Sequence, residues 1–163
     1  MLIGGSRLVV QTAALIAWLL TALAGLTMAV RYASRRAGRY AVDAVRDGQR
    51  GRLPGGLPEG DPPLVTGAVI FAHALVAGLG LLTLVLWLAN DGEDGWGHAR
   101  WAAFALAVLA AGLGLVMYAS WRQRGEGATR SRATDALPSG IVHLHGLAAA
   151  ATIVLVLVAA VSA

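Results

Sequence analysis

Residues 64–89 read LVTGAVIFAHALVAGLGLLTLVLWLA, an uninterrupted apolar stretch without Lys, Arg, Asp or Glu. A bilayer core of roughly 30 Å needs about 20 helical residues, so this stretch is long enough to cross it. Lipid offers no hydrogen-bond partner to backbone N–H and C=O groups, and such a segment must therefore be a helix. Three further stretches share these properties, and the predicted spans are residues 8–30, 64–89, 101–120 and 141–163.

The four spans predict an all-α integral membrane protein. With 57% hydrophobic and 13% charged residues, the composition is typical of a chain whose outer surface faces lipid. The expected fold is a single four-transmembrane-helix up-down bundle over residues 1–163. The chain has no cysteine, which excludes disulfides, iron–sulfur clusters held by thiolates and cysteine-bound zinc.

All thirteen basic residues are arginines, and most of them lie in two loops, between the first and second spans and between the third and fourth. By the positive-inside rule these Arg-rich loops are cytoplasmic, which predicts an N-out/C-out multi-pass topology in a bacterial-type plasma membrane. Because the arginines flank the spans, their expected partners are anionic lipid headgroups rather than nucleic acid. They are Arg31, Arg35, Arg36, Arg39, Arg46, Arg50 and Arg52 in one loop and Arg122, Arg124, Arg130 and Arg132 in the other.

The helix of the first span is expected to continue past the membrane into residues 31–63. Alanines recur at helical spacing from Ala33 to Ala44, and Gly48 ends the pattern. The continuation is either a straight extension of the first helix or, with a bend near Gly38, an amphipathic helix on the membrane surface. The Gly- and Pro-rich residues that follow predict an irregular linker.

Short sequences repeat between spans. His73-Ala-Leu-Val-Ala resembles His145-Gly-Leu-Ala-Ala, and Ala77-Gly-Leu-Gly-Leu resembles Ala111-Gly-Leu-Gly-Leu. The first match fits two related helical hairpins, whereas the second crosses the two units, and helices rich in Ala, Leu and Gly also match by chance. Glycines at such positions are expected to allow helices to approach closely, and they are Gly78, Gly80, Gly112 and Gly114.

Two intramembrane histidines are the candidate functional residues. Ionisable side chains in a span usually face the bundle interior, and His73 and His145 lie at depths of about 13 and 8 Å from the Arg-rich side. Two imidazoles on separate helices at similar depth suit the two axial positions of haem b, and small residues flank both. The haem propionates would then meet arginines at the same membrane face, with Arg31, Arg35, Arg122 and Arg124 as candidates.

His143 is expected to have a different role from His145. Residues two apart on a helix point about 200° away from each other, so only one of the two faces the bundle axis. We assign His145 as the ligand because it is deeper and because its surroundings match those of His73. His143 would then bond to a propionate, a headgroup or a neighbouring helix, while His98 is expected to be a solvated loop residue.

Several alternatives to haem ligation stay open. The histidines would serve helix packing alone if they bonded to carbonyls or to polar side chains, and a magnesium chlorin would need only one of them. A three-histidine zinc or copper site is also conceivable, but the angle between His143 and His145 disfavours it. The polar side chains available for structural hydrogen bonds are Thr66, Thr83, Thr12 and Gln11.

Tryptophans lie near most span ends. Trp87, Trp96, Trp101 and Trp121 are therefore expected to anchor the protein at the membrane interface. Trp18 lies in the middle of a span and is expected to pack against another helix or against a cofactor.

Through His73, His145 and their small neighbours, the chain resembles the small four-helix b-type cytochrome anchors of respiratory or photosynthetic electron-transfer complexes. It lacks the arginine-rich histidine motif of succinate dehydrogenase anchors, so quinone reduction is not implied. The resemblance implies a redox-complex subunit that binds haem b near the cytoplasmic face and passes electrons or holds a partner. The sequence shows no phosphate-binding Gly loop, Ser/His/Asp arrangement or intramembrane carboxylate pair, so catalysis by this chain alone is not expected. The alternative is a cofactor-free accessory or assembly subunit of a larger complex.

Overall fold

The structure is a computed structural model that describes residues 3–49, 65–90, 95–127 and 139–162. The described residues form four α-helices and no strand: α1 (Ile3–Gln49), α2 (Val65–Ala89), α3 (Gly97–Gly127) and α4 (Ser139–Val161). Each contains a segment long and apolar enough to cross a membrane, over Gly5–Ser34, Gly67–Ala89, Gly97–Ser120 and Ser139–Val161. The predicted all-α bundle of four membrane-spanning helices is confirmed. The predicted Gly/Pro linker and the loop arginines Arg130 and Arg132 lie outside the described residues.

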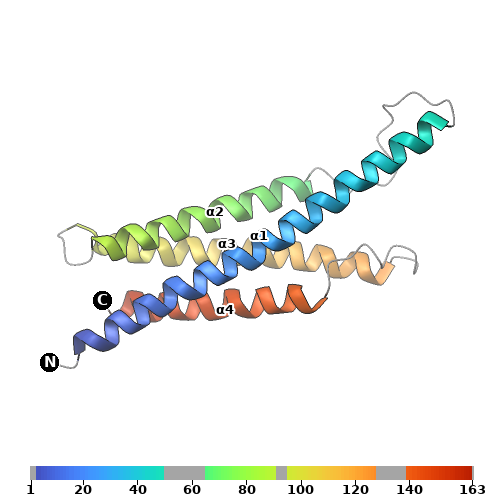
Figure 1. Cartoon of the computed structure of the whole chain (residues 1–163). Helices are drawn as coiled ribbons and strands as arrows, with labels where there is room; N and C mark the ends of the chain where they lie inside the picture. The colour runs from blue at the N-terminus through green and yellow to red at the C-terminus, as the bar shows by residue number, and fades with distance from the viewer. Residues whose placement is uncertain (1–2, 50–64, 91–94, 128–138, 163) are drawn as a thin grey trace.

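The first helix runs without a break from the membrane span into the Arg-rich segment. Figure 1 shows α1 as one long helix whose C-terminal part projects beyond the other three. The straight extension is therefore the correct alternative, and the helix does not bend at Gly38. It ends at Gln49, next to the Gly48 at which the sequence pattern stops.

The helices alternate in direction, so that both termini lie at the end of the bundle that also holds the connection between α2 and α3 (Figure 1). We call this the terminal end, and the opposite end, where α1 leaves and α4 begins, the Arg-rich end. α2 packs mainly against α3, and α1 packs mainly against α4. α2 and α4 therefore lie diagonally opposite each other. The predicted duplication of hairpins stays a prediction.

A small apolar core holds the four helices together on the side of the terminal end. Tryptophan and alanine dominate this core, in which Trp87 is only 2% exposed. The prediction that Trp87 anchors the membrane interface is therefore wrong, because its ring packs inside the bundle. Trp101, by contrast, is exposed. The core cluster consists of Ala14, Trp18, Leu84, Trp87, Ala103, Ala107, Val156 and Ala159.

Trp18 packs against a helix through a glycine. A Cβ at Gly80 would lie 2.7 Å from the Trp18 ring and 3.0 Å from Leu106, so only a glycine lets the indole lie against the α2 backbone. Nothing lies within 4 Å of the corresponding position at Gly78. Of these two glycines of α2, only Gly80 permits a close approach.

The contact between Trp18 and Gly80 gives a direct test of the core. We expect Gly80→Ala to destabilise the bundle by roughly 1 to 3 kcal/mol, because the added methyl group overlaps a ring that is enclosed on all sides. Gly78→Ala is the matched control and should be neutral or slightly stabilising, since alanine is the better helix former. Thermal unfolding of both variants in detergent, followed by circular dichroism, makes the comparison. Equal stability of the two variants would contradict this packing.

Candidate functional site

The imidazoles of His73 on α2 and His145 on α4 meet inside the bundle. Their ring centroids are 6.3 Å apart, and the ring planes make an angle of 69°. Because α2 and α4 are diagonal, this contact crosses the centre of the bundle rather than joining two neighbouring helices. Both side chains are half-buried. The structure thus brings together the two residues that the sequence assigns as a ligand pair.

His73 is held in one orientation by a backbone carbonyl. Its Nδ1 lies 2.8 Å from the carbonyl oxygen of Ala110 on α3. A carbonyl can only accept, so Nδ1 donates to it, and Nε2 is the ring nitrogen left for another partner. This second-sphere hydrogen bond is the type that orients metal-ligating histidines. Thr83, one of the polar side chains considered as structural partners, donates instead to the carbonyl of Leu79 in its own helix.

His145 has a different environment. Its Nδ1 is buried and has no hydrogen-bond partner of good geometry, although the ring lies close enough to the Thr21 backbone to interact with it. A buried polar atom without a partner destabilises a fold by about 1 to 3 kcal/mol. This nitrogen is therefore an atom of the site that a ligand could satisfy.

Glycines on the other two helices make room for the histidine rings. A Cβ at Gly25 on α1 would lie 3.1 Å from Cε1 of His145, and one at Gly114 on α3 would lie 3.4 Å from Cε1 of His73. Nothing lies within 4 Å of the position at Gly112. α1 and α3 form the other diagonal of the bundle. Each of them therefore contacts one ring of the histidine pair at a glycine, α1 at Gly25 and α3 at Gly114.

A pair of hydroxyls on the terminal side of the histidines joins α1 to α4. The Thr21 and Thr152 side-chain oxygens are 3.0 Å apart. Each also lies within hydrogen-bond distance of a carbonyl one turn earlier in its own helix, Ala17 for Thr21 and Ala148 for Thr152. Because a hydroxyl has one hydrogen, one of the two donates to the other and the second donates to its own carbonyl. This contact fixes α1 against α4 between the His145 ring and the core.

His143 faces away from the pair, as the angular argument predicts. Its Nε2 lies 3.3 Å from the Tyr118 hydroxyl on α3, and the two rings are 6.0 Å apart. Of the roles considered for His143, contact with a neighbouring helix is the one present. Among the residues that the structure describes, no three side chains gather as a metal-binding group. A three-histidine zinc or copper site is thus not formed.

The predicted propionate partners lie at the Arg-rich end. Arg31 and Arg122 are exposed, at about 9 and 12 Å along their helices from Gly25 and Gly114. Arg35 and Arg124 belong to α1 and α3, but their side chains are outside what the structure describes. His98 is exposed, but it lies in the first turn of α3 rather than in a loop.

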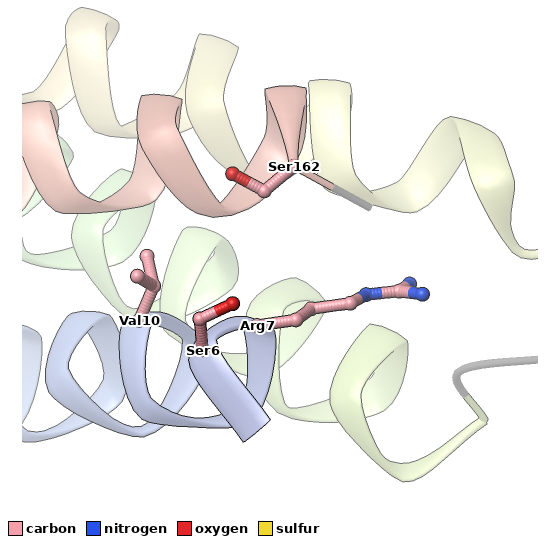
Figure 2. Close-up of a pocket in the computed structure, with 4 residues that line it drawn as sticks. All are labelled: Ser6, Arg7, Val10 and Ser162. Carbon is pink, nitrogen blue, oxygen red and sulfur yellow. The ribbon is translucent and has the colours of Figure 1, made fainter. Parts of the chain in front are cut away.

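A separate hollow lies at the terminal end of the bundle. Ser6, Arg7 and Val10 of α1 line a cavity of about 180 Å³ together with Ser162, which follows α4 (Figure 2). Figure 2 shows Ser6 and Val10 facing Ser162 across the gap while Arg7 extends past the end of α4. The histidine pair does not line this cavity.

Sequence reasoning missed three residues that shape the site: Gly25, Ala110 and Tyr118. Only Gly114 among the site glycines stands in a repeated motif, whereas Gly25 is a lone glycine in an apolar run and carries no distinguishing signal. The carbonyl of Ala110 is a backbone group, which no side-chain pattern can indicate. Comparison of the chain with protein families, with curated proteins and with solved structures finds no match.

Proposed function

We propose that this protein binds haem b between His73 and His145 and serves as a membrane subunit of an electron-transfer complex. The observation that carries the proposal is the contact of two imidazoles across the diagonal of the bundle, with centroids 6.3 Å apart. A metal–imidazole nitrogen bond is about 2 Å long, which puts the centres of two axial rings on one ion roughly 6 Å apart. The observed spacing agrees with that value.

The residues around the pair suit a flat macrocycle. His73 and His145 would hold the haem iron, and Gly25 of α1 and Gly114 of α3, which have no side chain, face the two imidazole rings. The Ala110 carbonyl engages Nδ1 of His73 and leaves Nε2, and Nδ1 of His145 is buried with no hydrogen-bond partner of good geometry. Arginines at one end of the bundle offer the partners that propionates need. A bound haem would supply one-electron transfer.

In this function the protein holds and insulates the redox group. His73 and His145 would hold its iron, and the Ala110 hydrogen bond would fix the orientation of the His73 ring. We place the protein in a bacterial-type plasma membrane with the Arg-rich end in the cytoplasm, following the positive-inside rule. Anionic lipid headgroups and other membrane subunits would contact that end.

The second candidate is a cofactor-free accessory subunit. The hydrogen bond from His73 to Ala110 favours it, because this bond ties α2 to α3 without any ligand. In that case the His145 ring would fill space between α1 and α4. A magnesium chlorin on one of the two histidines remains the pigment alternative.

Absorption spectroscopy of the purified protein separates these functions. We expect a Soret band that sharpens and shifts to longer wavelength on reduction, and release of protohaem into alkaline pyridine. A colourless protein, from cells supplied with haem precursor, would favour the accessory subunit. Extraction of a magnesium chlorin would replace haem by that pigment.

A further inference from the structure

Packing is unequal along the bundle. The described residues that are buried include Gln11, Ala14 and Trp18 on α1 and Thr152, Val156, Ala159 and Ala160 on α4. On each helix the buried positions lie between the histidine level and the terminal end, and no described residue on the Arg-rich side of His73 and His145 is buried. The bundle is therefore closed at the terminal end and loosely packed at the other.

The helices also diverge toward the Arg-rich end. Figure 1 shows α1 crossing the bundle obliquely and separating from α4 beyond the point where the two helices are in contact. α1 still lies against α4 at Gly25, where a Cβ would be 3.1 Å from Cε1 of His145. Past it, α1 continues as a projecting helix while α4 begins at Ser139.

The closed half is continuous from helix to helix. Leu84, Ala103 and Ala159 are 0% exposed, and the Trp18 ring lies against the α2 backbone at Gly80. From Thr152 to Ala160 this packed layer is about 12 Å thick. Close-packed interiors leave few voids as large as a water molecule, so such a layer blocks water and ions. The cavity at the terminal end reaches only to Val10, before the packed layer begins.

We propose that the His73–His145 pair is reached from the Arg-rich end alone, and that the apolar layer around Trp18 seals it from the terminal end. A ligand of the pair enters from the Arg-rich side, and a reductant or oxidant in water exchanges electrons with it there. The inference rests on the proposed function only in taking that ligand to be haem. That one end is sealed and the other open follows from the distribution of buried residues along the helices.

The charge of the two ends indicates the kind of partner. Among the described residues, α1 and α3 carry seven arginines and three acidic residues at the Arg-rich end, whereas the terminal end carries two arginines. Such a positive end attracts negatively charged partners and repels cations. A redox partner that docks at the open end therefore presents an acidic surface.

The absence of cysteine allows a clean test by single-cysteine labelling. Thr21→Cys places a thiol next to Thr152, at the face of the packed layer nearest His145, with little change in volume. The protein is reconstituted into vesicles in one orientation. Ser34→Cys and Ser162→Cys, both exposed at opposite ends, report that orientation. A charged, membrane-impermeant methanethiosulfonate is then added from one side at a time.

We expect Thr21→Cys to react at least tenfold faster with reagent on the Ser34 side than on the Ser162 side. Adding Trp18→Ala should make it reactive from both sides, whereas Trp101→Ala, which removes an exposed ring, should leave it one-sided. Equal rates from the two sides, faster reaction from the Ser162 side, or no reaction from either side would overturn the inference. One-sided reaction in a colourless protein would support the sealed bundle and contradict haem binding. Two-sided reaction in a red protein would support haem binding and contradict the sealed bundle.

Discussion

His73→Ala and His145→Ala should each lower the haem content of the purified protein by at least about tenfold. Loss of a residue that merely orients a metal ligand already weakens binding 10- to 100-fold, and these two variants each remove a ligand itself. The ratio of Soret to protein absorbance measures the effect. Because the histidines fill little of the core, circular dichroism should show that both variants remain helical.

Two other histidines provide matched controls. His143→Ala removes an imidazole two residues from His145 that contacts Tyr118 instead of the pair, and His98→Ala removes an exposed one. Both variants should keep the pigment of the unaltered protein. Equal pigment in all four variants would rule out the assigned ligands. Free imidazole should restore part of the band in His73→Ala, where the side chain leaves a space next to the His145 ring.

The helices and their order could be predicted because a membrane imposes a length and a composition on each span. The extension of α1 was also predictable, since alanines keep helical spacing after Val30 and stop near Gly48. The histidine pair followed from depth alone. His73 and His145 lie at similar distances from the Arg-rich ends of parallel helices, and depth decides which side chains can meet across a bundle.

The facing surfaces of the helices could not be predicted. α2 and α4 are apolar on every side, so their sequences carry no stripe that separates lipid-facing from buried positions. This is why Trp87 was assigned to the interface although it is buried, and why Gly78 and Gly80 could not be told apart. The contact partners of a glycine depend on the rotation of neighbouring helices, which only the structure shows.

Replacing the glycines at the histidine rings should remove the cofactor without removing a ligand. In Gly25→Leu, the Cβ alone would lie 3.1 Å from Cε1 of His145, and the remaining carbons would force the ring out of the site. Gly114→Leu should do the same to His73, where the Cβ would be 3.4 Å from the ring. Because both histidines remain present, a loss of haem would show that their rings are displaced. We expect the haem content of these leucine variants to fall nearly as far as that of His73→Ala and His145→Ala.

Gly112→Leu is the control that makes this test specific. It adds the same side chain to the same helix two residues away, at a position with nothing within 4 Å, and should leave the Soret band unchanged. Gly114→Ala is an intermediate case, since its methyl group would make only an ordinary contact with His73 and should preserve binding. If Gly112→Leu and Gly114→Leu lost the pigment equally, general disruption of α3 would be the cause. If only Gly114→Leu lost the pigment, the orientation of the His73 ring would be the cause. That orientation is set by the hydrogen bond to the Ala110 carbonyl and by the space at Gly114, and ligation between α2 and α4 depends on it.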